Sequence, residues 1–104
     1  MNCRYTHFDT PYIDIQNYYL DSKVVNLIPI GIAGYYQIIA IEKICNILTV
    51  GITNLETKIY IPTIEKQLDN KYLIIPILIN KSDWEEIFQS AYIHDNNEEI
   101  NWIG

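Results

Sequence analysis

The side chains that could do chemistry in this sequence are few and widely spaced. His7 and His94 lie near opposite ends of the chain, and Cys3 and Cys45 lack Cys-x-x-Cys spacing, so neither a zinc site nor a disulfide framework is indicated. None of the four glycines stands beside a lysine, which excludes a phosphate-binding loop of the GxxxxGK type. Neighbouring carboxylates are most simply solvated charges. We therefore expect a protein that is not an enzyme and that has no cofactor and no metal ion.

Tyrosine is the residue type in surplus, with nine copies in 104 residues. It is favoured at protein interfaces because it gives a large contact area at low entropic cost and keeps a polar tip. Two interpretations stay open. Either the rings cover the edge of the core and point their hydroxyls to water, or they form a partner-binding surface. The residues that would form this surface are two adjacent pairs: Tyr18, Tyr19, Tyr35 and Tyr36.

Length and composition indicate one folded domain. A chain of 104 residues can form a single core without disulfides, and 49% hydrophobic with 19% charged residues is typical of globular proteins. The net charge of −6, with no basic stripe, argues against a nucleic acid partner. The first nine residues carry no signal-peptide pattern. We therefore expect a cytoplasmic protein without direct membrane insertion.

The elements that must position the second tyrosine pair lie in the most hydrophobic stretch, residues 24–53. Its first part is about as long as the ~20 residues that span a bilayer. However, a proline, two glycines and a glutamine interrupt it and no basic cluster flanks it, which disfavours a transmembrane segment. We instead predict a short helix capped by Asp21 or Ser22, a break at Pro29 and a second helical segment over residues 30–36.

A two-stranded hairpin follows this broken helix. Residues 38–44 and 47–52 are rich in Ile, Val and Thr, which favour strands. Asn46 tolerates the left-handed conformation that the intervening turn requires. In the preceding helix, Gly31 and Gly34 would allow a close approach to the sheet.

The next two elements are a helix and a strand. Residues 55–70 contain a helix whose firm start is expected near Ile61, because the proline that follows suits a first turn. Residues 72–79 are predicted to form a buried strand, and Pro76 inside it indicates an edge position or a bulge, since proline cannot donate to a neighbouring strand.

The last element is a helix introduced by a Ser-x-x-Glu pattern. Ser82 and Glu85 would satisfy each other's exposed backbone N–H groups as a capping box, and the helix should end near Tyr92. The apolar residues after Ser82 recur at helical spacing, which indicates a buried stripe on this helix.

These elements together predict an α/β (α+β) fold. The sheet is expected to be small, three-stranded and mainly antiparallel, packed with helices in the order helix, strand, strand, helix, strand, helix. The domain should cover residues 11–92, after an N-terminal tail over residues 1–10 and before an acidic C-terminal tail or linker over residues 93–104.

The central part of the chain, LIPIGIAGYYQIIAIEKICNILTVGITNLETKIYIPTIEKQLDNKYLIIPILINKSDWEEIFQSAY, resembles the N-terminal domain of the type II secretion and type IV pilus assembly ATPases. Matching positions include Ile28-Pro29, the step Leu48-Thr49-Val50-Gly51 and the final helix ending near Tyr92. Pro11-Tyr12-Ile13-Asp14-Ile15 is similar to a segment that often precedes them. Leu55 departs from the family, which usually has proline there. The upstream RLG-type repeat by which some relatives bind cyclic di-GMP is missing.

This resemblance implies a protein–protein docking domain. In such ATPases the domain docks on the cytoplasmic part of an inner-membrane platform protein and recruits the motor to the machine. The chain would then lie in the cytoplasm, peripheral to the inner membrane through its partner. Two alternatives stay open: a stand-alone acidic inhibitor or immunity-type protein that masks a basic partner, and a cyclic di-GMP sensor.

Overall fold

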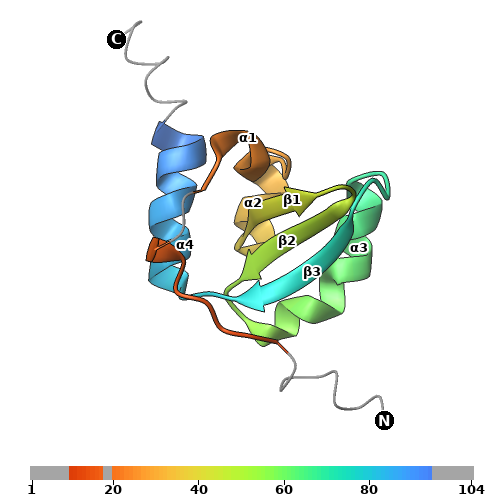
Figure 1. The fold of residues 1–104 in the computed structure, drawn as a ribbon, viewed down its shortest axis with the longest axis horizontal. Coiled ribbons are helices and arrows are strands. Elements are labelled where there is room, and N and C mark those ends of the chain that lie inside the picture. The colour runs from red at the N-terminus through yellow and green to blue at the C-terminus, as the bar shows by residue number, and fades with distance from the viewer. Residues whose placement is uncertain (1–9, 18–19, 95–104) are drawn as a thin grey trace, which may run out of the picture.

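The computed structural model describes residues 10–17 and 20–94 of the 104-residue chain. Helices pack around a sheet of three strands, β1 (Ile38–Ile44), β2 (Ile47–Ile52) and β3 (Leu73–Leu78), in the spatial order β1-β2-β3 (Figure 1). The predicted α+β class and the predicted order of helices and strands are both confirmed.

The β1–β2 hairpin has the predicted bounds, and its strands pair antiparallel up to Ile44 opposite Ile47. The turn between them differs from the prediction. Cys45 has a φ of 56°, so it is the left-handed residue, and Asn46 is not. Asn46 is already engaged in the sheet, because its carbonyl accepts a hydrogen bond from the N–H of Leu73 at 2.8 Å.

The β2–β3 pair is parallel along its whole length, so the sheet is mixed. Between these strands the chain runs through η4 (Leu55–Tyr60) and α3 (Ile61–Gln67). Such a helical crossover brings the chain back in its original direction, which makes the pair parallel. β3 lies at the edge of the three-stranded sheet, as Pro76 predicted. Beyond it, Tyr12 forms a single parallel bridge with Leu78.

The long hydrophobic stretch begins with two short helices, α1 (Ser22–Val25) and α2 (Ile30–Tyr36), on either side of Pro29. The Asp21 side chain caps α1 by accepting from the N–H of Lys23 at 2.9 Å. Within the part of the chain that the structure describes, no helix is long and apolar enough to cross a membrane.

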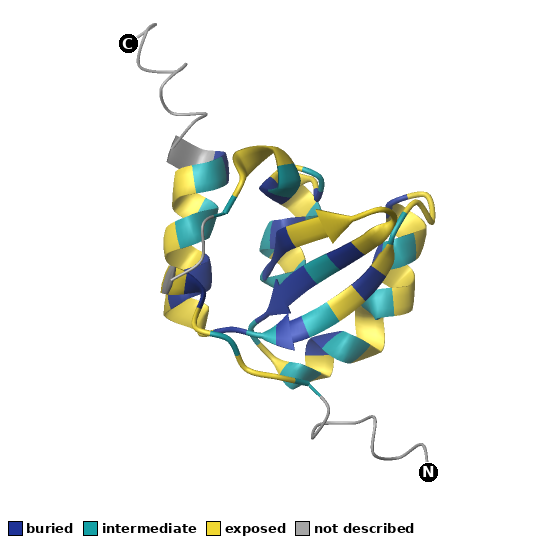
Figure 2. Ribbon diagram, in the orientation of Figure 1, coloured by how far each residue is buried: buried dark blue, intermediate teal, exposed yellow. Residues whose placement is uncertain are grey.

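The core lies where the helices meet the sheet. In Figure 1, α2 and α3 lie behind the sheet, and α4 (Lys81–Phe88) stands beside it. The first four residues of β1 are buried and its last three are exposed, whereas β2 is buried from Val50 to Ile52 (Figure 2). Burial therefore concentrates at the end of the sheet where α1 and α4 contact β1.

The last helix is tied to the core at two points. α4 continues as a wider helical segment, η5 (Gln89–His94). The indole N–H of Trp84 donates to the carbonyl of Ile38 at 2.9 Å. The hydroxyl oxygen of Tyr92 lies 2.6 Å from the carbonyl oxygens of both Val25 and Ile28. These bonds satisfy backbone carbonyls that burial has removed from water.

The start of α4 corrects the predicted capping box. The cap is Asn80, whose side-chain oxygen accepts from the N–H of Ser82 at 2.9 Å. Asn80 has the extended backbone that a cap requires, with φ −76° and ψ 137°. The Ser82 hydroxyl itself donates to Asn80 at 2.9 Å, so Ser82 lies inside the helix.

The two glycines of α2 do not approach the sheet in the way we expected. A Cβ built on Gly34 would lie 3.2 Å from Cζ of Phe88, so Gly34 makes room for a ring on α4. A Cβ on Gly31 would meet nothing within 4 Å. The close approach is therefore between two helices, and it involves only the second glycine.

Candidate functional site

The last turn of α2 presents the predicted pair Tyr35 and Tyr36. α2 ends because Gln37 adopts a left-handed conformation with a φ of 58°, which turns the chain into β1. The two rings have centroids 4.8 Å apart and planes at 86°, an edge-to-face arrangement. Tyr35 is 80% exposed, whereas Tyr36 is half-buried and packs against the core.

A third tyrosine, Tyr60, joins this pair from the end of η4. Its ring centroid lies 5.6 Å from that of Tyr36, with a tilt of 42° between the planes, and it is 48% exposed. The sequence did not predict this contact, because no local pattern links η4 to α2. We call Tyr35, Tyr36 and Tyr60 the tyrosine cluster.

The loop before η4 is fixed against the end of α2. Asn54 caps η4 by accepting from the N–H of Glu56 at 2.9 Å, and its carbonyl accepts from the N–H of Thr57 at 2.9 Å. Just before it, the Thr53 hydroxyl donates to the Gln37 side-chain oxygen at 3.4 Å. The bond from Thr53 links the chain before η4 to the turn that ends α2, and the two bonds to Asn54 fix the start of η4 itself.

The tyrosine cluster and this loop line an open surface pocket of about 250 Å³. Besides the three rings, it is lined by Asn54, Glu56 and Thr57. Three tyrosines and one glutamate thus line the same small space. Such a lining can stack against planar or cationic groups and can accept hydrogen bonds.

The structure describes only one of the two predicted tyrosine pairs, because Tyr18 and Tyr19 lie outside the described residues. Tyr35 projects into solvent, and Tyr36 packs against the core. A partner-binding role for either residue stays a prediction.

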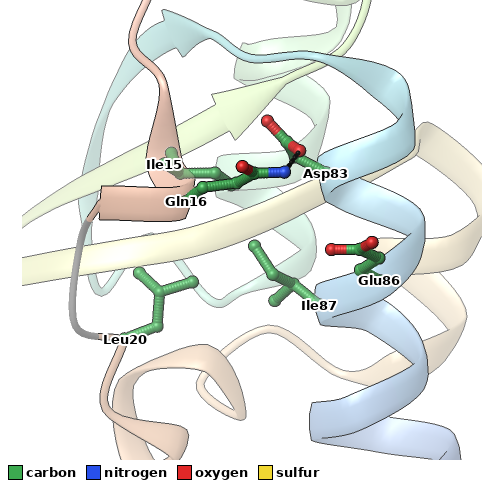
Figure 3. A pocket seen from close by; sticks show the side chains of 6 residues that line it. All are labelled: Ile15, Gln16, Leu20, Asp83, Glu86 and Ile87. Carbon is green, nitrogen blue, oxygen red and sulfur yellow. Dashed lines mark hydrogen bonds between the residues drawn. The ribbon is translucent and has the colours of Figure 1, made fainter.

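A second pocket lies between the N-terminal segment and α4, with a volume of about 290 Å³ (Figure 3). Gln16 donates from Nε2 to the buried carboxylate of Asp83 at 2.8 Å. Asp83 belongs to the first turn of α4, where the helix dipole favours a negative charge. This hydrogen bond joins the N-terminal segment to α4, so the fold itself explains why the Asp83 carboxylate is buried and paired. The remaining lining residues are Ile15, Leu20, Glu86 and Ile87.

The hairpin end of the sheet carries an exposed apolar row. Ile44, Ile47 and Leu73 are register partners across the three strands, so their side chains share one face. Ile75 lies two residues further along β3 on that same face. Their exposed fractions are 60%, 40%, 51% and 42%. This row is a second surface on which a partner could bury apolar area.

The residues that could support catalysis or metal binding are not brought together in the described part of the chain. No group of three His, Cys, Asp or Glu side chains is found there that could hold a metal ion. Cys45 is exposed at the hairpin turn. The pKa of Tyr92 is raised to about 12 by burial, and this tyrosine already binds backbone carbonyls in the core.

Comparison with known proteins finds similar solved structures but no similar sequence. No protein-family model and no curated protein matches the chain. A solved structure described as "Structure of MshE with cdg" is similar over 82% of this chain, with a TM-score of 0.69 and 18% sequence identity. The chain has the fold of a region of MshE, a type IV pilus ATPase. The matched region spans 60% of that chain.

The match confirms the fold that the family resemblance implied. The residues quoted for the resemblance lie in elements with the expected order, from the break at Pro29 to the last helix. At 18% identity the likeness concerns the backbone arrangement. The function of the tyrosine cluster depends on its side chains, which a likeness of backbones does not describe.

Proposed function

We propose that this chain is a non-catalytic docking domain of a type IV pilus or type II secretion ATPase system. In this proposal it binds the cytoplasmic part of an inner-membrane platform protein and recruits the motor to it. The protein would act in the cytoplasm and reach the inner membrane only through that partner. The observation that carries the proposal is the tyrosine cluster, which lies on a fold shared with a type IV pilus ATPase.

The geometry of the cluster supports docking. Tyr35 is exposed, and its ring rests edge-to-face on Tyr36, which packs against the core. A partner would therefore meet a ring that is already held in place, and less side-chain entropy would be lost on binding. Tyrosine is enriched among the residues that dominate binding energy at protein interfaces.

A binding assay with purified components tests this proposal. The platform protein encoded beside the pilus or secretion genes of the same genome supplies the probe, as its isolated cytoplasmic fragment. We expect wild-type chain to retain the fragment and Tyr35→Ala to retain much less, at an unchanged melting temperature. Tyr12→Ala is the matched control, because Tyr12 is also exposed, at 57%, and its sheet bridge uses backbone atoms.

Two results of this assay would contradict the proposal. The first is that wild-type chain does not retain the platform fragment. The second is that Tyr35→Ala and Tyr12→Ala bind it equally well. Retention of a basic protein encoded next to this chain, in place of the platform fragment, would favour the acidic inhibitor alternative.

Cyclic di-GMP binding is the second candidate, because the similar MshE structure is described with cdg. The chain's net charge of −6 opposes the approach of a phosphodiester ligand. Calorimetric titration of the chain with cyclic di-GMP distinguishes the two candidates. Saturable heat would establish a nucleotide ligand, and a flat trace would eliminate this candidate.

A further inference from the structure

The tyrosine cluster forms a corner of aromatic faces. Tyr35 and Tyr36 are nearly perpendicular, at 86°, and Tyr60 adds a third ring with its centroid 5.6 Å from that of Tyr36. Each ring carries negative charge density on its face, so a cation placed within about 6 Å of a ring centroid is attracted. All three rings line the same small pocket, and aromatic rings gathered around one site can recognise an organic cation.

A carboxylate completes the lining of this pocket. Glu56 lines the same 250 Å³ space, and its backbone N–H is held by Asn54 at 2.9 Å. Lys58, which also lies on η4, donates from Nζ to the Thr10 hydroxyl at 2.6 Å. Glu56 thus adds a negative charge to the residues that line the pocket, and the chain as a whole carries a net charge of −6.

The residue types that line the pocket favour a planar cation. A guanidinium group stacks on aromatic faces and also forms paired hydrogen bonds with a carboxylate, whereas an ammonium group is a compact, strongly hydrated charge. An anionic ligand would be repelled by Glu56. A neutral planar ligand would use the rings and leave the carboxylate without a counter-charge.

We propose that the pocket formed by Tyr35, Tyr36, Tyr60 and Glu56 binds the guanidinium group of an arginine that a basic segment of the protein partner presents. This inference rests on the proposed docking function and specifies the chemistry of its partner. Arginine is itself enriched at interface hot spots, which tend to pair across the two surfaces.

A peptide titration followed by NMR chemical shifts tests the pocket directly. The probes are acetyl-Gly-Arg-Gly-amide, the same peptide with citrulline as the neutral isostere, and the same peptide with lysine, all at constant ionic strength. We expect saturable shifts around the tyrosine cluster with the arginine peptide. Its dissociation constant should be about fivefold or more below that of the citrulline peptide. Equal binding of the arginine peptide and either of the other two would overturn the inference.

Matched variants distinguish the contributions of the aromatic ring, the phenol hydroxyl and the carboxylate charge to binding. Tyr35→Phe keeps the aromatic face and should bind the arginine peptide about as well as wild type, whereas Tyr35→Leu should bind it about fivefold or more weakly. Glu56→Gln should weaken binding about twofold or more, and Glu42→Gln, which removes an exposed carboxylate on β1, should not. Equal binding by Tyr35→Leu and wild type, or equal loss in the two glutamine variants, would contradict a specific pocket.

The two proposals can fail separately. Binding of the platform fragment with no preference for arginine over citrulline would overturn the arginine pocket and leave the docking function standing. Arginine-selective binding by a chain that does not retain the platform fragment would support the pocket and overturn the docking function.

Discussion

Gly51 and Ile79 approach so closely that a side chain on Gly51 would overlap with Ile79. A Cβ built on Gly51 would lie 2.9 Å from both Cδ1 and Cγ2 of Ile79 and 3.1 Å from Cδ1 of Ile41. The N–H of Ile79 donates to the carbonyl of Ile52 at 2.9 Å, which holds the chain beside β2 as it leaves β3. The missing side chain therefore allows the segment between β3 and α4 to pack on the sheet.

Gly51→Ala should destabilise the protein. The added methyl group meets two buried isoleucines, and overpacking of a core costs about 1–3 kcal/mol. Urea denaturation followed by circular dichroism measures the difference in the free energy of unfolding.

Gly31→Ala is the matched control for this substitution. Gly31 lies within α2, is exposed, and has nothing within 4 Å of its Cβ position. Alanine favours the helix over glycine by up to about 1 kcal/mol, so this variant should be more stable than wild type. If Gly51→Ala were as stable as wild type or more stable, the close approach at Gly51 would have no energetic consequence.

Asn80→Ala should lower the free energy of unfolding by about 1 kcal/mol, because the Asn80 side chain caps the first turn of α4. Ser82→Ala should have a smaller effect, within about 0.5 kcal/mol, since Ser82 is exposed and lies inside the helix. Thermal denaturation of the two variants side by side makes the comparison. A larger loss of stability for Ser82→Ala than for Asn80→Ala would indicate that Ser82 is the cap and would contradict the observed start of the helix.

The hairpin and the break at Pro29 could be predicted from the sequence because local chemistry determines them. β-Branched residues favoured the two strands, and proline could not continue the first helix. The cap of α4 was misplaced because Asn80 and Ser82 are both good cap residues only two positions apart. The choice between them depends on backbone conformation, which a Ser-x-x-Glu pattern does not reveal.

Contacts between residues far apart in the chain could not be predicted from the sequence. β3 pairs parallel with β2 because the chain crosses over through η4 and α3. The order of elements along the sequence was predicted, but this parallel pairing was not. Tyr60 joins Tyr35 and Tyr36 only because α2 and η4 are folded side by side. The candidate site was therefore half predicted: one adjacent pair was named, and the third ring and Glu56 were missed.

Tyr92 should make the stability of the protein depend on alkaline pH. Burial raises the pKa of Tyr92 from 10.0 to about 12 in the folded state. Between these values the unfolded chain loses the phenol proton and the folded chain keeps it, so deprotonation favours unfolding. Below pH 10 both states hold the proton and this contribution to stability is fully present. Stability should then fall as pH rises through 12, by up to about 1.4 kcal/mol per pH unit.

Tyr92→Phe isolates this effect from the other tyrosines of the chain. The variant lacks the hydroxyl that bonds to the carbonyls of Val25 and Ile28, so at pH 7 it should be less stable by about 1 kcal/mol or more. It also lacks the group whose pKa burial raises, so its loss of stability between pH 10 and 12 should be shallower. Urea denaturation of both proteins across that range gives the two curves. Because the other titrating groups are common to both, parallel curves would mean that Tyr92 ionises alike in the folded and unfolded states, and the proposed role of its burial would be wrong.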